Sequence, residues 1–233
     1  MRKLLLSLAL LSSLAAGAAD TTNVVVMLGD STTLCSANKP GFKLTEFVQA
    51  HLTKTEHLQV SVVNSGVGGD TAQGGLGRLQ LDVFRHNPAV VTISFGLNDT
   101  GKLTPEEYRA AIEKIVQSIQ TNTHAKILLI TSTPFNNARH AWKDKYAAKG
   151  GLDQYMDTHI CAAEREIAKK YNLTLCDLHA HFNAQFKRNG KLIDAIILPD
   201  GVHLTDKGNE AAAEFVAPFV AKLLGAPDPG TRK

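Results

Sequence analysis

The chain is predicted to fold as one α/β domain built around a doubly wound parallel sheet. Apolar runs of strand length alternate with segments of helical period, and the runs are continuous Val, Ile and Leu rather than apolar residues alternating with polar ones. Continuous apolar runs are typical of strands that helices cover on both faces. Strand–helix alternation favours right-handed crossovers between parallel strands. A chain of 233 residues is long enough for one well-buried domain and short for two.

The predicted strands and helices follow one another in regular order. The strands are expected at Val24–Leu28, Leu58–Val63, Val90–Phe95, Lys126–Thr131 and Leu173–Asp177. The helices are expected at Leu44–Thr53, Gly75–Arg85, Glu106–Thr121, Leu152–Tyr171 and Asp206–Leu224. No repeat, low-complexity tract or linker interrupts this order, so residues 20–225 are predicted to form a single domain.

Two of the helices carry specific local signals. Before the third helix, Thr104, Pro105 and Glu107 supply an N-cap residue, a first-turn proline and a capping-box glutamate. Pro218 predicts a kink in the last helix. The apolar stripe of that helix consists of Ala212, Phe215, Val216, Phe219 and Val220.

Residues 1–19 are predicted to be a secretory signal peptide. Arg2 and Lys3 precede the mostly apolar stretch 4–14, and Ala16-Gly17-Ala18 fits the small-residue cleavage pattern. The apolar stretch is too short to span a bilayer stably, although a retained membrane anchor is the alternative. The expected location is therefore secreted or periplasmic, and residues 226–233 are expected to form a frayed tail.

Charge and cysteine content narrow the function classes. The net charge of +3 falls to +1 once Arg2 and Lys3 are removed, which gives no electrostatic reason to expect a nucleic-acid partner or a membrane surface. In an oxidising compartment the cysteines Cys35, Cys161 and Cys176 allow one disulfide, with Cys161–Cys176 the favoured pair. Three buried thiols are the equally weighted alternative.

Ser31 is the candidate nucleophile. It lies just past the carboxyl end of the first predicted strand, where open α/β sheets bind ligands, and Gly29 permits a tight turn there. A serine hydroxyl becomes reactive when a base removes its proton, so Ser31 needs a histidine partner. The alternative is that Asp30 or Ser31 only caps a turn. Thr33 stands where the Gly-x-Ser-x-Gly elbow has glycine, which argues against the common α/β-hydrolase fold.

Asp200 and His203 are the candidate acid and base. Pro199 and Gly201 mark irregular backbone just before the last helix. Across such a turn, a carboxylate can accept a hydrogen bond from the Nδ1–H of a histidine three residues later. This fixes the tautomer, leaves Nε2 free to take a proton and stabilises the imidazolium. An ordinary surface loop is the alternative interpretation of this pair.

Gly66 and Asn98 are the candidate oxyanion donors. They follow the second and third predicted strands, at the same sheet edge as Ser31. A tetrahedral intermediate needs preorganised N–H donors, which a glycine backbone and an asparagine amide can supply. The alternative is that both residues only close turns.

Four blocks in this order resemble the GDSL/SGNH hydrolase family and span nearly the whole mature chain. They are Gly29-Asp30-Ser31, residues 64–71 with Gly66, Gly96-x-Asn98-Asp99 and Asp200-x-x-His203. The resemblance implies a flavodoxin-like three-layer α/β/α sandwich with a five-stranded parallel sheet. It also implies that Ser31 is the nucleophile, His203 the base and Asp200 its orienting acid. The implied oxyanion hole consists of the Ser31 and Gly66 backbone N–H groups and the Asn98 side chain.

The sequence departs from the family pattern at Thr32, which replaces the leucine of the family's common name. The resulting Gly-Asp-Ser-Thr is similar to rhamnogalacturonan acetylesterases, whereas residues 200–204 resemble lysophospholipase-like and acetylhydrolase-like members. The family includes acetylesterases acting on carbohydrates, lipases, lysophospholipases and thioesterases. The catalytic assignment is unaffected by this departure, but the substrate remains open.

Two further groups of residues are candidates for a metal site and for a substrate wall. Asp177, His179 and His181 follow the fifth strand at alternate positions, but a metal there would need another ligand from elsewhere, and aspartate commonly starts a helix. No metal or cofactor is therefore expected. Trp142, Tyr146 and Tyr155 are candidates for a substrate wall, with ordinary packing as the alternative.

The sequence thus predicts a secreted serine ester hydrolase that acts through an acyl-enzyme. The preferred substrate is a small-molecule or polysaccharide ester with a short acyl group, in particular an acetyl group on a carbohydrate. A lysophospholipase or thioesterase acting on lipid acyl groups, and an acyltransferase using the same residues, are the alternatives. A carbohydrate-binding or scaffold protein with an inactive site is a further class, disfavoured because every catalytic block is intact.

Overall fold

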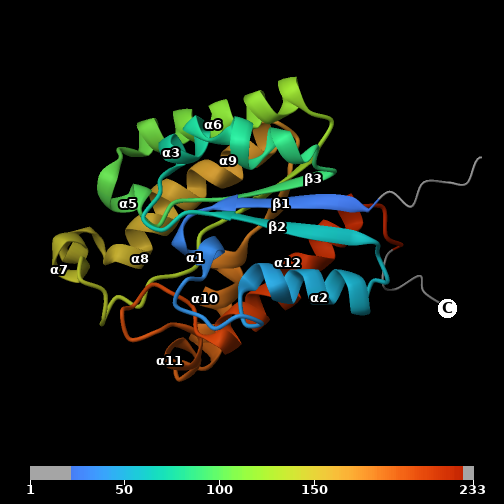
Figure 1. Ribbon diagram of the computed structural model, residues 1–233. Coiled ribbons are helices and arrows are strands. Elements are labelled where there is room, and N and C mark those ends of the chain that lie inside the picture. Colours follow the sequence, from blue (N-terminus) through green and yellow to red (C-terminus); the bar gives the residue numbers. More distant parts are fainter. Residues whose placement is uncertain (1–21, 228–233) are drawn as a thin grey trace, which may run out of the picture.

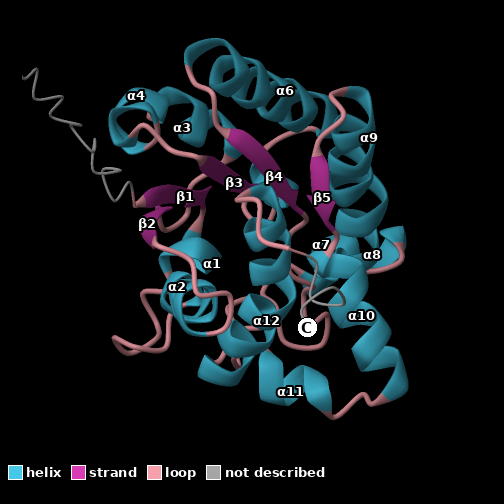
Figure 2. Cartoon of the chain, turned by 90° about the vertical axis from the view of Figure 1, so that its right-hand side faces the viewer, coloured by secondary structure: helices cyan, strands magenta, loops and turns pink. Residues whose placement is uncertain are grey.

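The computed structural model describes residues 22–227 and has a five-stranded parallel sheet at its centre. The strand order is β2-β1-β3-β4-β5, as Figure 2 shows. The strands are β1 (Asn23–Gly29), β2 (Val60–Gly66), β3 (Val90–Ser94), β4 (Lys126–Ile130) and β5 (Thr174–Cys176). Every predicted strand is confirmed, with ends that differ by a few residues.

Helices cover both faces of the sheet, so the predicted three-layer α/β/α architecture is confirmed (Figure 1). One face carries α3 (Ala72–Gly77), α6 (Pro105–Asn122) and α9 (Ala162–Lys170). The other carries α2 (Leu44–Lys54), α10 (Leu178–Arg188) and α12 (Asp206–Leu223). Val25 and Met27 of β1 point to one core, whereas Val26 and Leu28 point to the other. A strand covered in this way has no polar face, hence its continuous apolar sequence.

The predicted helix Gly75–Arg85 is wrong as a single element. The chain instead forms α3, a short α4 (Leu79–Asp82) and the 3₁₀ turn η1 (Phe84–His86). The break falls at Arg78, whose φ of −113° and ψ of 10° are not helical. The glycines of α3 have low helix propensity, and Gly75 is held there by packing, since a Cβ would lie 2.3 Å from the Phe95 ring.

The other long helices match the prediction more closely. The segment predicted as Leu152–Tyr171 contains α8 (Leu152–Tyr155), a π-helical stretch η3 (Met156–Cys161) and α9. The capping box before α6 is confirmed, because Thr104 Oγ1 accepts from Glu107 N at 3.2 Å and Glu107 Oε2 accepts from Thr104 N at 2.8 Å. Pro218 lies inside α12, and the helix continues past it to Leu223.

Several shorter helices were not predicted, because each is too short for a periodic pattern. These are α1 (Ser31–Leu34), α5 (Asp99–Lys102), α7 (Lys143–Tyr146), η2 (Ala147–Lys149) and α11 (Leu192–Ile196). The longer α10 was also missed. Figure 1 places α1, α5, α7 and α8 at one end of the sheet, where the strands have their carboxyl ends.

The cysteines Cys35, Cys161 and Cys176 are all buried and free. Cys161 packs in the core beneath α6 and α9, whereas Cys176 packs in the core beneath α12. The two residues therefore lie on opposite faces of the sheet, and the suggested Cys161–Cys176 disulfide is wrong. The two residues lie on consecutive elements of the chain, but the sequence does not show the face of the sheet on which each side chain lies.

The predicted signal peptide, residues 1–19, lies outside the described residues. Within residues 22–227, no helix has the length and apolar character needed to span a bilayer. At the other end, Ala226 N donates to Ala221 O at 3.0 Å, so the expected frayed tail is not seen at this residue. Residues 228–233 lie outside the described part.

Two buried carboxylates accept backbone N–H groups in the loops that follow the strands. Asp30 caps α1, and its Oδ1 accepts from the backbone N and the hydroxyl of Thr32, each at 2.9 Å. Asp99 Oδ1 accepts from Ala72 N at 2.8 Å, and its Oδ2 accepts from Gly96 N at 3.0 Å. Burial raises the pKa of each of the two carboxyls from 3.8 to about 6, although these hydrogen bonds partly offset the effect.

The pKa of Asp99 leads to a pH-dependent stability. Because its pKa is higher in the folded than in the unfolded protein, folding takes up a proton between about pH 4 and pH 6, and this contribution to stability falls as pH rises through that range. We therefore expect the unfolding free energy of the wild type, relative to Asp99→Asn, to decrease over this range by about 3 kcal/mol at most. Urea denaturation at a series of pH values measures it.

Glu107→Gln provides a control of opposite sign. Hydrogen bonds from the Thr104 N–H and hydroxyl lower the pKa of this exposed carboxyl, so its contribution to stability is present above the unfolded pKa and lost as pH falls. The unfolding free energy of the wild type relative to Glu107→Gln should rise with pH. A pH-independent difference for Asp99→Asn would contradict the account of its buried carboxyl.

Candidate active site

Three strands end level with one another beside Ser31. In the sheet register, Gly29 of β1 pairs with Gly66 of β2 on one side and with Ser94 of β3 on the other. The chain passes from β1 to β2 on one side of it and then crosses to β3 on its other side. This reversal of strand order marks the switch point at which such sheets bind ligands. Gly29 has no room for a side chain, because a Cβ would lie 2.2 Å from Thr33 Oγ1.

Ser31, His203 and Asp200 form a continuous chain of hydrogen bonds. His203 Nε2 lies 2.9 Å from Ser31 Oγ, and His203 Nδ1 lies 2.7 Å from Asp200 Oδ2. Because a carboxylate accepts, Nδ1 carries the proton and Nε2 is left to accept from the serine hydroxyl. The structure thus brings together the residues that the sequence predicted as nucleophile, base and acid.

The turn that carries Asp200 holds its carboxylate in place. Asp200 Oδ1 accepts from Val202 N at 2.9 Å and from His203 N at 3.0 Å. Burial alone would raise the pKa of Asp200, but these hydrogen bonds and that of the His203 ring together leave the pKa below 3.8. The carboxylate is therefore ionised over the neutral range and can stabilise a protonated His203.

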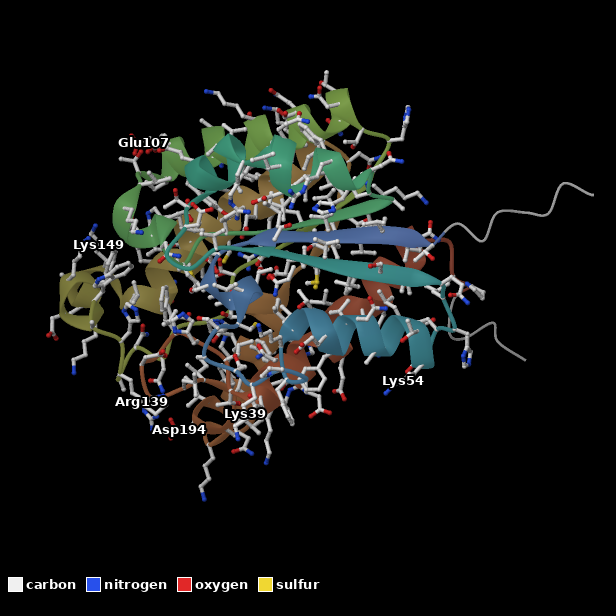
Figure 3. All side chains as sticks on the ribbon, viewed as in Figure 1. Lys39, Lys54, Glu107, Arg139, Lys149 and Asp194 are labelled. Carbon is white, nitrogen blue, oxygen red and sulfur yellow. The ribbon has the colours of Figure 1, made fainter. Side chains whose placement is uncertain are left out.

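The loop after β4, residues 131–142, supports this turn from one side. Asn136 N donates to Gly201 O at 2.8 Å. Gly201 has a φ of +81°, and a Cβ at this position would lie 2.6 Å from His140 N. Farther along the loop, Arg139 pairs with Asp194 of α11 at 2.9 Å, and Figure 3 shows the two side chains near each other at the lower rim.

The candidate oxyanion donors differ in how free they are. The Ser31 backbone N–H has no hydrogen-bond partner among the described residues. Asn98 Nδ2 donates to Asp70 O at 2.9 Å, which leaves its second N–H for a ligand. The Gly66 N–H already donates to Asn64 Oδ1 at 3.0 Å, and the Asn64 amide is held in turn by Thr33 O at 2.9 Å. Gly66 is therefore not available without a movement of Asn64.

Within the described residues, Gly69, which is not among the predicted donors, has a free N–H where Gly66 does not. It has a φ of +74° in a turn closed by Asp70 N donating to Val67 O at 3.3 Å. Its own N–H has no partner within residues 22–227. Its neighbour Asp70 supplies the carbonyl that Asn98 binds, so the Gly69 N–H lies in the same loop as the asparagine contact.

Arg78 was also missed, and it holds this region together. Its guanidinium donates to Gly29 O at 2.9 Å, Ser65 O at 2.8 Å, Asp70 Oδ2 at 2.8 Å and Asp82 Oδ2 at 2.6 Å. One side chain thereby ties the ends of β1 and β2 to the loop that carries Gly69 and Asp70. In the sequence, Arg78 is a single arginine next to a glycine-rich segment. Nothing there distinguishes it from an ordinary surface arginine.

The residues weighed as a metal site at Asp177, His179 and His181 do not converge. Asp177 caps α10 and pairs with Arg165 at 2.7 Å. His179 is buried, whereas the His181 ring stacks on Phe215 with centroids 3.7 Å apart.

The aromatic residues proposed as a substrate wall serve mainly in packing. Tyr146 is buried and donates to Thr100 O, and Tyr155 stacks on His159 with centroids 4.1 Å apart. Trp142 packs on Gly101 of α5, three residues after Asn98.

Comparisons with known proteins agree with this architecture. The model of the GDSL-like Lipase/Acylhydrolase family matches residues 27–211. The chain is 26% identical to thioesterase 1/protease 1/lysophospholipase L1 of Escherichia coli (strain K12), over 90% of this chain and 85% of that protein. It is also 26% identical to an acetylxylan esterase of Xylanibacter ruminicola, over 58% of this chain and 29% of that longer protein.

Among solved structures, the lipase/acylhydrolase from Enterococcus faecalis has a TM-score of 0.72 at 24% identity, with 88% of this chain and 99% of that chain covered. This likeness shows a shared fold. The family match extends from β1 to α12 and includes all the residues that meet at the strand ends. This protein therefore belongs to the GDSL-like lipase/acylhydrolase family and is a hydrolase of the esterase and acylhydrolase type.

Proposed function

We propose that this hydrolase cleaves carboxylic esters through an acyl-enzyme formed on Ser31. The observation that carries the proposal is the pair of contacts at His203, 2.9 Å to Ser31 Oγ and 2.7 Å to Asp200 Oδ2. His203 Nε2 takes the proton as Ser31 Oγ attacks the ester carbonyl, and returns it to the leaving alcohol. Water then attacks the acyl-enzyme by the same route and releases the acid.

The tetrahedral intermediate would be stabilised by the Ser31 N–H and the free N–H of the Asn98 amide. We propose Gly69 N–H as the third donor in place of the predicted Gly66, because the Gly66 N–H is bonded to Asn64. Arg78 and the Asp70 carbonyl would position these groups before the substrate arrives. Donors fixed in advance stabilise charge without reorganisation during the reaction.

The proposed substrate is an ester with a short acyl group, in particular an acetylated carbohydrate. The hollow beside Ser31 is only about 10 Å³ and is lined by Thr32, Cys35, His203 and Asn209. This is the space of roughly one water-sized or methyl-sized group. The similarity to an acetylxylan esterase is in keeping with an acetyl ester as the substrate.

The larger cavity among residues 22–227 lies away from Ser31. This mostly apolar cavity of about 590 Å³ is lined by Pro218, Phe219 and Leu223 of α12. It also contacts Lys126 and Thr174, the first residues of β4 and β5. It thus lies at the amino ends of the strands, opposite the edge that carries Ser31.

We also propose that residues 1–19 are removed and that the protein is secreted or exported to the periplasm.

Variants of Ser31 and His203 test whether these residues take part in catalysis or only support the folded structure. Ser31→Ala and His203→Ala should each lower kcat by about 10⁴ to 10⁶, and the double variant should be no worse, because the two groups act as one unit. Hydrolysis of a chromogenic acetate ester measures this. Ser36→Ala, at an exposed residue of the same loop, is the control and should retain wild-type kcat. Substantial activity in His203→Ala would contradict the role of that ring.

Asn98→Ala tests the oxyanion site. If the amide contacts the developing charge, kcat should fall by about 10² to 10³ while KM changes little, since the contact forms in the transition state. Asn122→Ala, at the exposed end of α6, is the matched control. A change confined to KM would show that Asn98 binds the ground state instead.

The acyl length can be tested with p-nitrophenyl esters from acetate to palmitate. We expect kcat/KM to be highest for acetate and to fall by at least tenfold by octanoate, because the hollow lined by Ser31 has room for a methyl-sized group. A rise with chain length would contradict the acetylesterase proposal. It would favour a lipid acylhydrolase, as the name of the Escherichia coli relative suggests for that protein.

A further inference from the structure

A second cluster of polar side chains lies between η3 and α10, away from Ser31. Asp157 and Cys161 belong to η3, and His179 belongs to α10. One ligand atom from each of these residues lies within 4.8 Å of the other two. Asp153 of α8, one turn before Asp157, has its Oδ2 3.7 Å from His179 Nε2.

The His179 ring is oriented with one nitrogen toward this cluster. Its Nδ1 lies 3.3 Å from Ser132 O, and because a carbonyl only accepts, Nδ1 carries the proton. The lone pair of Nε2 then faces the carboxylates, with Asp157 Oδ1 at 3.9 Å. A backbone carbonyl that fixes the other ring nitrogen is the usual support of a histidine that binds metal.

Two atoms of the cluster lack the hydrogen bonds that buried polar atoms normally make. The Cys161 side chain is 0% exposed, and its thiol has no hydrogen-bond partner in the described part of the chain. Asp157 Oδ1 is buried and accepts no hydrogen bond of good geometry, although Arg165 Nη1 lies 2.8 Å away in an ion pair. Such unsatisfied groups call for a ligand or another explanation.

The charges around the cluster also favour a cation. Arg165 pairs with two carboxylates, those of Asp157 and Asp177, whereas Asp153 lies beside His179. These two carboxylates exceed the one guanidinium by one negative charge, and burial raises the pKa of the nearby Asp153 carboxyl. Asp153 is bonded to the neutral donors Phe135 N and Asn183 Nδ2, at 2.7 and 3.0 Å.

We propose that Asp157, Cys161 and His179 bind a divalent transition metal of the Zn²⁺ type, with Asp153 as the fourth ligand. A thiolate, an imidazole and carboxylates match the ligands that Zn²⁺ prefers, whereas Mg²⁺ and Ca²⁺ prefer oxygen alone. On binding, Cys161 Sγ forms a bond to the metal and releases its proton to solvent. Asn183 Nδ2, now 3.0 Å from His179 Nε2, turns away to free that nitrogen.

The metal would join η3 to α10 and fix the start of the loop after β4. His179 holds Ser132 O and Asp153 holds Phe135 N, and the same loop packs on Gly201 beside His203. The π-helical turn that contains Asp157 and Cys161 agrees with a ligand site, since such turns often occur at functional positions. This proposed site differs from the sequence-based expectation that no metal is bound. Of Asp177, His179 and His181, only His179 is one of its ligands.

Co²⁺ titration of the whole protein tests the site, because a thiolate–Co²⁺ bond gives a near-ultraviolet charge-transfer band that other ligands do not. We expect one Co²⁺ per chain with this band, and its loss on adding Zn²⁺. The band should be absent in Cys161→Ser and retained in Cys176→Ser, a buried thiol on the other face of the sheet. Asn183→Ala should retain it.

Asp157→Asn keeps the test decisive if Cys161→Ser fails to fold, since the Asp157 side chain is 41% exposed. This variant should fold, as judged by circular dichroism, and bind Co²⁺ at least tenfold more weakly. The proposal is overturned if the wild type shows no thiolate band at millimolar Co²⁺. It is also overturned if Cys161→Ser keeps the band, or if Asp157→Asn binds as tightly as the wild type.

Discussion

The hydrogen bond between His203 and Ser31 joins residues that are 172 positions apart, and the rest of the site depends on it. The bond exists because β1, β2 and β3 end at the same level, so that Ser31 emerges above the sheet while the turn before α12 returns to the same edge. A parallel sheet covered on both faces fixes this geometry through its core. The chemistry then requires only that short loops present a few polar groups to one point.

Polar contacts hold those loops in addition to apolar packing. Arg78 ties the ends of β1 and β2 to the Asp70 carboxylate, and Asp99 ties the end of β3 to the start of α3. Burying the Asp99 carboxylate raises its pKa and is therefore unfavourable at neutral pH, yet it satisfies two backbone N–H groups that water cannot reach. The loops that carry the proposed oxyanion donors are thus rigid before any substrate binds.

The strands could be predicted from the sequence because each is a continuous apolar run, and α2, α6 and α12 could be predicted because each repeats a helical apolar pattern over several turns. The break at Arg78 could not be predicted, since this side chain contacts Gly29, Ser65 and Asp70, which lie on other segments of the fold. Ser31, Asp200 and His203 could be identified because each type of side chain is required by the chemistry. By contrast, the choice between the Gly66 and Gly69 N–H groups rests on which one Asn64 already occupies, and a sequence does not show that. The faces of the sheet on which Cys161 and Cys176 lie could be determined only from the folded structure.

A fluorophosphonate probe reacts with activated serines and therefore tests whether His203 activates Ser31 as a nucleophile, when the modified peptide is identified by mass spectrometry. We expect stoichiometric labelling of Ser31 in the wild type and labelling at least a thousandfold slower in His203→Ala. Labelling of a different residue, or labelling of Ser31 at the same rate without the imidazole, would contradict this activation.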